Sequence, residues 1–295
     1  MTFKDVMEGY QKTVETYLQT LFAEDAPQKQ LFDAMRYSLL AGGKRIRPIL
    51  VLEFCRICGG DAEKAMPFAA AIEMVHTYSL IHDDLPCMDN DDYRRGRLTN
   101  HKVYGVGHAI LAGDGLLNYA YECLLENAAA YPENLRGHML AAKAIANRAV
   151  VRGMIAGQSL DLLSEHMEPD AERLLYIHTH KTADLLTAPL LAAAYIAGAS
   201  EEQIDALRRF GFCVGIAFQI DDDLLDVEGD AALLGKQTGM DAQRGKMTWP
   251  ALVGVAAAKE RSARLWDEAE EALGIFGERA AFMHGFAAQM RTRKS

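Results

Sequence analysis

The stretch Leu80–Arg97 reads Leu-Ile-His-Asp-Asp-Leu-Pro-Cys-Met-Asp-Asn-Asp-Asp-Tyr-Arg-Arg-Gly-Arg and places five aspartates directly before three arginines. Asp83 and Asp84 end an apolar run, so we expect their carboxylates where a mostly buried helix reaches a cavity or an edge. Carboxylates in such a place need a cation. Mg²⁺ suits them, because it prefers oxygen ligands and is usually held by one or two carboxylates plus substrate phosphates. A solvated acidic loop is the alternative that charge runs usually represent.

The proline in this stretch bears on how its carboxylates can meet. Pro86 has no N–H to donate to His82 and is expected to break or kink the helix. On a straight helix, Asp89 would lie roughly 120 to 140° away from Asp83 and Asp84. A turn after Leu85 would bring it back. The arginines that follow, Arg94, Arg95 and Arg97, would supply the anion-binding half of the site.

A second aspartate cluster lies in Phe218–Asp226, Phe-Gln-Ile-Asp-Asp-Asp-Leu-Leu-Asp. Gln219, Asp222, Asp223 and Asp226 are spaced i, i+3, i+4 and i+7, which places them on one stripe of a helix. Ile216, Ile220, Leu224 and Val227 fall on another stripe. Like charges at i, i+4 cost a few tenths of a kcal/mol per pair, which a bound cation would offset. An exposed helical face is the alternative, but no Lys at i+4 compensates these charges.

Asp-Asp-x-x-x-x-Asp followed by Arg-Arg-Gly, together with the later Asp-Asp-x-x-Asp, resembles the two aspartate-rich motifs of short-chain trans-polyprenyl diphosphate synthases. Within that family the chain looks most like the bacterial farnesyl diphosphate synthases (geranyltranstransferases). The resemblance implies an isoprenoid synthase type I helical bundle around a deep central cavity. It also implies several Mg²⁺ ions that bridge both clusters and an allylic diphosphate. Their ligands would be Asp83, Asp84, Asp89, Asp222, Asp223 and Asp226.

The implied activity is that of a transferase, a trans-prenyltransferase. It would condense isopentenyl diphosphate with dimethylallyl or geranyl diphosphate, giving (2E,6E)-farnesyl diphosphate and diphosphate. A geranylgeranyl diphosphate synthase of the same family is the alternative. The resemblance also implies a homodimer. The residues expected to take part in catalysis are Asp83, Asp84, Asp89, Arg94, Lys181, Asp222 and Lys236.

The cations of the chain divide between the two substrates in this family. The loop Gly42–Pro48 has three cations in four positions, and its glycines allow close backbone approach to a phosphate, although such loops are usually just solvated. The resemblance assigns Lys44, Arg47, His76 and Arg95 to isopentenyl diphosphate. It assigns Arg94, Lys181, Lys236 and Lys246 to the allylic diphosphate and places the Thr182 hydroxyl in the cavity. Thr182 and Gln219 are both expected to bind substrate.

Product length is addressed by Tyr78 and Ser79. Ser79 lies at i−4 from Asp83, about 6 Å below it on the same helix face. In the family, a large aromatic residue five positions before the first Asp acts as a floor that stops growth at fifteen carbons, whereas a smaller residue allows twenty. Tyr78 therefore favours farnesyl over geranylgeranyl diphosphate. A core aromatic facing a neighbouring helix is the alternative.

The bulk composition fits one soluble domain. The 295 residues are 50% hydrophobic, enough for a large core, and no linker or repeat interrupts them. We therefore expect a single domain over residues 1–295. The formal net charge of −10 argues against nucleic acid and anionic membranes as partners. The N-terminus has no signal-peptide pattern and no apolar run approaches 18 residues, so we expect a cytoplasmic protein without membrane insertion.

Apolar residues recur at helical spacing almost throughout the chain, and sustained strand alternation is absent, so the pattern predicts an all-α fold. The predicted helices cover residues 4–22, 29–40, 47–58, 61–85, 107–130, 135–157, 171–196, 201–227, 247–272 and 278–290.

Other interpretations start from single motifs. Cys55 and Cys58 form a Cys-x-x-Cys without a second pair, so we expect buried thiols rather than a zinc site. His178 and His180 at i, i+2 do not share a helix face, which argues against a metal pair. An HD-type metal phosphohydrolase built on His76, His82 and Asp83 would leave the second cluster unexplained. A terpene cyclase would not need the isopentenyl diphosphate residues. A Ca²⁺-binding scaffold fails the EF-hand pattern, because Tyr93 and Arg94 occupy ligand and glycine positions.

Overall fold

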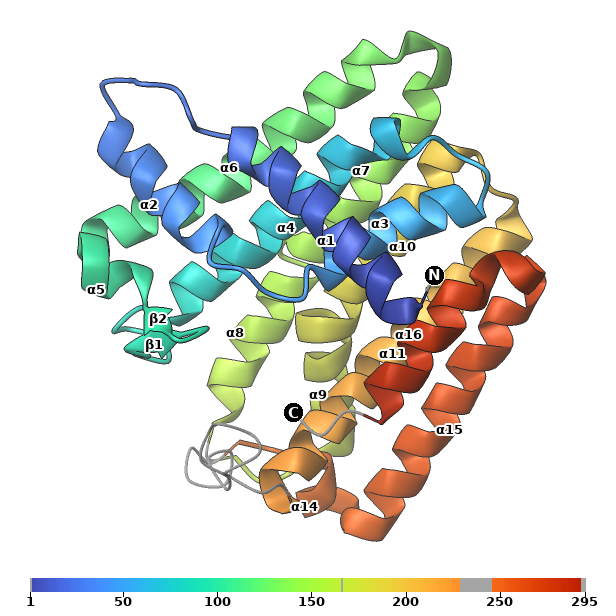
Figure 1. Cartoon of the computed structure of the whole chain (residues 1–295). Coiled ribbons are helices and arrows are strands. Elements are labelled where there is room, and N and C mark those ends of the chain that lie inside the picture. The colour runs from blue at the N-terminus through green and yellow to red at the C-terminus, as the bar shows by residue number, and fades with distance from the viewer. Residues whose placement is uncertain (1, 166, 229–245, 293–295) are drawn as a thin grey trace. The chain divides into compact units, whose positions relative to one another are not determined.

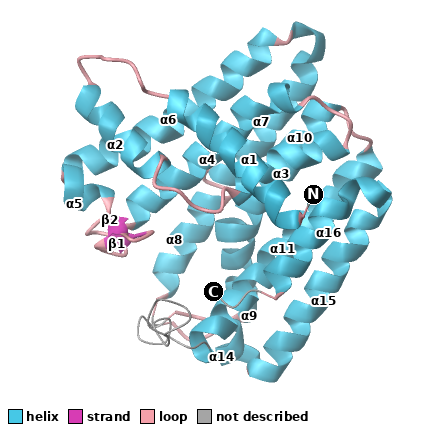
Figure 2. Cartoon of the chain, in the orientation of Figure 1, coloured by secondary structure: helices cyan, strands magenta, loops and turns pink. Residues whose placement is uncertain are grey.

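Helices make up nearly all of the computed structural model, which describes residues 2–165, 167–228 and 246–292 (Figure 1). The predicted all-α fold is confirmed, since the described strands are confined to one short hairpin (Figure 2). The chain divides into two compact units. The first covers residues 1–143 and 192–198, and the second covers residues 144–191 and 199–295.

The first unit is built on two long helices, α4 and α6. It contains α1 (Phe3–Thr20), α2 (Lys29–Leu39), α3 (Ile46–Ile57), α4 (Ala62–Asp83), β1 (Tyr93–Arg94), β2 (Arg97–Leu98), α5 (Asn100–Tyr104), α6 (Val106–Ala130), the 3₁₀ turn η1 (Pro132–Asn134) and the start of α7 (Leu135–Ala149). Helix α4 packs against α3 and α6. It is apolar on all sides along most of its length, which is the pattern of a fully buried helix.

The second unit is built on α11 and α15. It contains α8 (Met154–Ser164), α9 (Ala171–Ile177), the π-helix η2 (His178–Ala183), most of α10 (Asp184–Ala197), α11 (Glu201–Glu228), α14 (Trp249–Val253), α15 (Val255–Leu273), the 3₁₀ segment η3 (Gly274–Ala280) and α16 (Ala281–Arg291). One core cluster joins α9, η2, α11, α14 and α15 through Leu174, Ala183, Ile216, Ile220, Leu224, Trp249 and Ala258.

Several predicted helix bounds were wrong for identifiable reasons. The helix predicted over 135–157 is interrupted between α7 and α8 at Gly153, where a Cβ would lie 2.1 Å from the carbonyl oxygen of Arg148. The segment 247–272 breaks at Gly254, whose φ of 82° ends α14. Val227 was predicted on an apolar stripe but is 55% exposed, because it lies one residue before the end of α11.

The hairpin β1–β2 was not predicted. Its two turn residues, Arg95 and Gly96, have φ of 53° and 73°, and Arg94 pairs with Arg97 across it. Positive φ at both central positions is the type I′ geometry that suits a two-residue hairpin. With strands of only two residues, the hairpin gives no alternation for a pattern analysis to detect. Among the described helices, none is both long and apolar enough to cross a membrane.

Candidate active site

The first aspartate cluster stands where α4 ends. Asp83 is the last helical residue and Asp84 the cap, as Pro86 predicted. The backbone N–H of Asp89 donates to the carbonyl oxygen of Asp83 over 2.8 Å. This turn brings the segment that carries Asp89 back to the helix end, which confirms the expected return. Asp83 and Asp89 are half-buried and Asp84 is buried.

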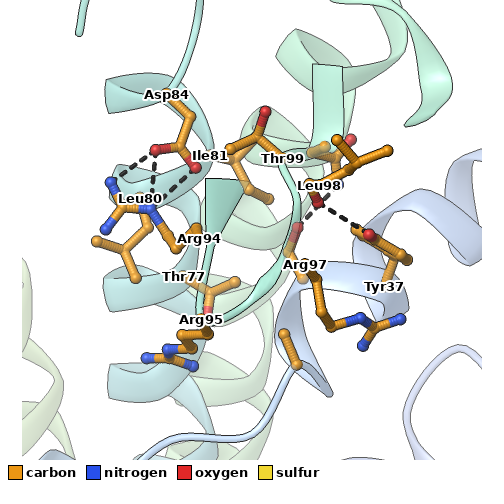
Figure 3. Close-up of a pocket in the computed structure, with 13 residues that line it drawn as sticks. Tyr37, Thr77, Leu80, Ile81, Asp84, Arg94, Arg95, Arg97, Leu98 and Thr99 are labelled. Carbon is orange, nitrogen blue, oxygen red and sulfur yellow. Dashed lines mark hydrogen bonds and ion pairs between the residues drawn. The ribbon is translucent and has the colours of Figure 1, made fainter. Parts of the chain in front are cut away.

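The hairpin places Arg94 on Asp84 (Figure 3). Arg94 Nε donates to both carboxylate oxygens at 2.8 and 2.9 Å, and Nη2 donates to Oδ1 at 2.6 Å. Burial raises the pKa of Asp84 and Arg94 opposes that effect. The small pocket beside this pair has a volume of about 30 Å³, room for about two water molecules. It is too small to be a substrate cavity by itself.

The cations of the basic loop before α3, Lys44 and Arg45, differ in burial and in partners. Arg45 is buried and donates from Nε to Glu15 and from Nη1 to Glu73, each at 2.6 Å. It therefore holds the loop to the rest of the unit. Lys44 is exposed. Gly43 has a φ of 124°, and a Cβ there would lie 2.8 Å from Cζ of Arg95, so the missing side chain admits that guanidinium.

Arg47, His76 and Arg95 lie close enough to one another for their charges to interact. Burial, followed by the charges of Arg47, Arg95 and Arg94, holds the pKa of His76 well below 6.5, so its ring is neutral at pH 7. Burial and the charge of Arg95 lower the pKa of Arg47 to about 10, whereas Glu73 opposes them. Within the residues the structure describes, Arg47 Nε is buried and has no hydrogen-bond partner. A buried guanidinium donor without a partner fits a place for an anion.

Tyr78 and Ser79 lie on α4 one turn before the aspartates. Tyr78 is 6% exposed, and its ring meets His82 edge to face with centroids 5.7 Å apart. Burial, the nearby Tyr121 and Asp83 raise the pKa of Tyr78. The hydroxyl of Ser79 donates to the carbonyl of His76 over 2.9 Å, back into its own helix. The aromatic environment of Tyr78, including Tyr121 and His82, was not found from the sequence.

The second aspartate cluster occupies the last two turns of α11. Asp222 is half-buried, while Asp223 and Asp226 are buried. Asp223 Oδ2 accepts the backbone N–H of Trp249 over 2.9 Å, which fixes the start of α14 on α11. Asp221 belongs to the same run but accepts from Ser262 and from Trp266 Nε1, so it holds α15. Asp221 and Asp223 thus fix different helices on α11, α15 and α14.

The π-helix of the second unit presents Lys181 and Thr182. Lys181 Nζ pairs with Asp161 Oδ2 at 2.5 Å, and the Thr182 hydroxyl donates to Gln219. Gly157 permits this approach of α8, because a Cβ there would lie 2.3 Å from the backbone nitrogen of Lys181. The neighbouring residues Lys181 and Thr182 thus contact α8 and α11 respectively, and their roles in substrate binding stay predictions. π-helical turns often occur at functional sites.

The segment that carries Lys246 is tied to this group through Trp249. Trp249 Nε1 donates to His178 Nδ1 over 3.1 Å, and its backbone N–H binds Asp223. His180 pairs instead with Asp184 at 2.7 Å, so the two histidines serve different partners. Lys246 is half-buried. Lys236 lies outside the described residues, and Trp249 was missed because its contacts are entirely tertiary.

The predicted metal ligands fall in both units. Within residues 2–165, 167–228 and 246–292, no group of three or more His, Cys, Asp or Glu side chains is arranged to hold a metal ion. The chemistry of the predicted ligands nevertheless fits Mg²⁺. The donors are carboxylate oxygens, and Mg²⁺ needs only one or two of them when water and phosphate oxygens complete its shell.

Comparison with known proteins identifies the family of this chain. The polyprenyl synthetase family model matches residues 28–273. The chain belongs to the polyprenyl synthetase family. It is 46% identical over 267 residues to geranylgeranyl pyrophosphate synthase 3 of Arabidopsis thaliana, which is chloroplastic, covering 88% of this chain and 73% of that protein. It is 43% identical to a dimethylallyltranstransferase of Fischerella ambigua over 290 residues, covering 98% and 83%.

Solved structures of family members show the same fold. An FPP/GFPP synthase of Zymomonas mobilis, in its apo form, matches with a TM-score of 0.87 and 33% identity, covering 97% of each chain. A geranyltransferase of Legionella pneumophila matches with a TM-score of 0.87 and 35% identity, covering 99% of this chain and 97% of that one. The predicted isoprenoid synthase fold is thereby confirmed, and this family member is a short-chain prenyltransferase whose substrates are isoprenyl diphosphates.

Cys55 and Cys58 take no part in the candidate site. Cys55 is buried, and its thiol lies 3.5 Å from the carbonyl oxygen of Asp61. Burial, with the nearby Cys58 and Asp61, raises the pKa of Cys55 to about 12. A thiol that stays protonated is a poor nucleophile and a poor zinc ligand. The prediction of buried thiols is therefore confirmed for Cys55 but wrong for Cys58, which is only half-buried because it caps the end of α3.

Proposed function

We propose that this prenyltransferase condenses isopentenyl diphosphate with dimethylallyl or geranyl diphosphate and releases (2E,6E)-farnesyl diphosphate and diphosphate. The observation that carries the proposal is the buried Nε of Arg47, which has no partner in the described part of the chain and lies near His76 and Arg95. An anion there would satisfy the donor. A terpene cyclase would have no use for a second diphosphate site.

The isopentenyl diphosphate would be held by Lys44, Arg47 and Arg95, with neutral His76 as a hydrogen-bond donor. Arg47 stays charged at pH 7, because its pKa is lowered only to about 10. His76 adds no further positive charge, since burial and its cationic neighbours keep it neutral. Because this diphosphate stays attached during the reaction, these residues bind and orient the substrate without taking part in bond breaking.

The allylic diphosphate would be bound by Arg94, Lys181, Lys236 and Lys246, with Thr182 and Gln219 beside it. Arg94 and Lys181 now pair with Asp84 and Asp161, and each would exchange that carboxylate for the diphosphate. When bound at the carboxylates of Asp83, Asp84, Asp89, Asp222, Asp223 and Asp226, Mg²⁺ supplies electrostatic stabilisation of the leaving diphosphate. The cationic side chains add to that stabilisation as negative charge develops on the leaving group.

The allylic fragment that remains is electron-poor and reacts with water. Apolar walls would exclude water, while the residues that hold isopentenyl diphosphate would present its double bond. The chain needs no nucleophilic side chain for this step. A side-chain base is also unnecessary, because the departing diphosphate can accept the proton.

The fifteen-carbon product is supported by Tyr78. Its side chain is 6% exposed and packs edge to face on His82, as a fixed wall one turn before Asp83 would. The second candidate product is geranylgeranyl diphosphate. It is favoured by relatives such as the Arabidopsis enzyme named geranylgeranyl pyrophosphate synthase, at 46% identity.

Product analysis decides between them. Radiolabelled isopentenyl diphosphate, in excess, would be incubated with geranyl diphosphate and Mg²⁺, with a chelator control. We expect C15 product from the wild type, no product with chelator, and a shift to C20 or longer from Tyr78→Ala. A wild-type C20 product would establish the second candidate. An unchanged C15 product from an active, folded Tyr78→Ala would refute the role of Tyr78 as the floor of the product site.

A separate assay with a nucleotide tests the alternative of a metal phosphohydrolase. Release of inorganic phosphate from the nucleotide would favour that alternative.

We also propose that both units form one catalytic domain, because a single family model spans residues 28–273 and so includes parts of each.

A homodimer is the assembly we propose. The exposed apolar side chains of Leu111 and Leu125 on α6, 54% and 57% exposed, are compatible with a covered face. Light scattering coupled to size-exclusion chromatography would give the mass, and a value near 32.5 kDa would refute the dimer. The cytoplasmic location stays a prediction.

A further inference from the structure

A glycine on α6 receives the imidazole of His82. A Cβ built on Gly113 would lie 2.2 Å from Nε2 and 2.5 Å from Cδ2 of that ring. No real Cβ stands so close, so the ring occupies the space that a side chain at this position would fill. Helix α4, which carries His82, packs extensively against α6, which carries Gly113. The glycine therefore forms a notch in which His82 is seated.

A hydrogen bond fixes the ring in this notch. His82 Nε2 lies 3.1 Å from the carbonyl oxygen of Ile110, and a carbonyl only accepts, so Nε2 carries the proton and donates. The carboxylate of Asp114 lies 3.8 Å from the same nitrogen. The imidazole is thus held by three residues within about one turn of α6: the backbone carbonyl of Ile110, the missing side chain of Gly113 and the nearby carboxylate of Asp114.

The anchored ring in turn meets Tyr78. The two residues are four apart on α4, which places their side chains on one face of the helix. Their ring planes are 83° apart with centroids separated by 5.7 Å, the edge-to-face geometry that aromatic pairs prefer. Tyr78 is 6% exposed. One side of the tyrosine ring is therefore set by a residue that α6 holds in place.

We propose that His82 is a specificity-determining residue, which keeps Tyr78 in the position that stops chain growth because it is itself seated in the Gly113 notch of α6. This inference rests on the proposed function, since it takes Tyr78 as the floor of the product site. His82 would act through Tyr78 and need not touch the substrate. The proposal adds a second helix, α6, to the control of product length.

The test measures the ratio of C20 to C15 products, which a general loss of folded enzyme would leave unchanged. His82→Ala removes the ring and is expected to raise the ratio by about two- to twelvefold, the factor that corresponds to one lost edge-to-face contact. His82→Gln keeps an N–H donor for the Ile110 carbonyl but lacks the ring, and it should raise the ratio similarly. It also replaces the alanine variant if that one does not fold.

Double variants separate the inference from the proposed function. In a Tyr78→Ala background, His82→Ala should add nothing, because it acts through the missing tyrosine. Gly113→Ala, which pushes the imidazole out of its notch, should raise the ratio in the wild type but not in a His82→Ala background. If Tyr78→Ala lengthens the product and neither His82 variant does, the His82 inference is overturned and the floor stands. If Tyr78→Ala leaves the product unchanged, the floor fails and the inference fails with it.

Discussion

The guanidinium of Arg94 holds the carboxylate of Asp84 through three hydrogen bonds of 2.6 to 2.9 Å. Asp84 is a proposed metal ligand and Arg94 a proposed diphosphate ligand. In this pair, the carboxylate and the guanidinium that would bind Mg²⁺ and diphosphate bind each other instead. If Mg²⁺ and the diphosphate bind here, this pair must separate, and the two charges remain neutralised throughout. In their absence, the pair avoids leaving a buried carboxylate uncompensated.

Removal of Arg94 should therefore reduce stability as well as turnover. The Asp84 side chain is only 4% exposed and Arg94 is 33% exposed. We expect Arg94→Met to lower the free energy of unfolding by about 2 to 3 kcal/mol, less than for a fully buried pair because Arg94 is partly solvated. Urea titration measures this. Adding Asp84→Asn should recover part of the loss, and a double variant as unstable as the single one would contradict the pairing argument.

Neighbouring aspartates of α11 should respond differently to the same substitution. Asp222→Asn removes a proposed metal ligand and is expected to lower kcat by orders of magnitude with little loss of fold, as is Asp83→Asn. Asp221→Asn is the matched control. It disturbs the contacts with Ser262 and Trp266, so it should reduce the melting temperature and spare most of the turnover.

Direct Mn²⁺ binding, followed by electron paramagnetic resonance with diphosphate present, adds a readout that does not depend on catalysis. We expect weaker binding by Asp222→Asn than by Asp221→Asn. Near-normal kcat for Asp222→Asn at saturating Mg²⁺ would rule out its role as a ligand.

The basic loop provides a similar contrast between Arg47 and Arg45. Arg47→Ala should raise KM for isopentenyl diphosphate at least about tenfold, with a smaller effect on the allylic substrate, because it removes a cation that binds the retained diphosphate. Lys44→Ala should act in the same direction. Arg45→Met is the control. It breaks the buried pairs with Glu15 and Glu73 and should lower stability by about 3 kcal/mol. Equal KM effects of Arg47→Ala on both substrates would argue against two separate diphosphate sites.

Helix positions were predictable because their signals are local. The stripe of Gln219, Asp222 and Asp226 follows from residue spacing, and the end of α4 follows from Pro86. The turn that returns Asp89 could be anticipated for the same reason. By contrast, the break at Gly153 depends on crowding by the Arg148 backbone, which no periodic pattern contains.

The sequence did not predict which of two neighbouring residues of the same type has a structural role and which is left for the site. Arg45 and Arg47 are equally basic in the sequence, and only the tertiary position of Glu73 and Glu15 makes one structural. Asp221 and Asp223 likewise differ through partners on α15 and α14. Such partners come from distant parts of the chain, so local spacing carries no information about them. The role of each member of a cluster therefore had to come from the structure.

His178 predicts how the stability of the second unit depends on pH. Its ring is buried, and Nδ1 accepts the indole N–H of Trp249 over 3.1 Å. Burial lowers the pKa of His178 to about 4 from 6.5. Because the folded pKa is below the unfolded one, protons favour the unfolded chain. The stabilisation is complete above pH 6.5 and is lost as the pH falls toward 4, by about 3 kcal/mol in total.

The variant His178→Asn isolates this contribution. Asn offers an acceptor oxygen near the position of Nδ1 but does not titrate. The free energy of unfolding, measured by urea titration from pH 8 to pH 4, should therefore fall less steeply with acidification than in the wild type. His76 and His138 also have lowered pKa values but are present in both proteins, so their effects cancel in the difference. Relative to the variant, the wild type should lose up to about 3 kcal/mol of stability between pH 6.5 and pH 4. Parallel curves across the whole range would show that His178 does not titrate with the fold.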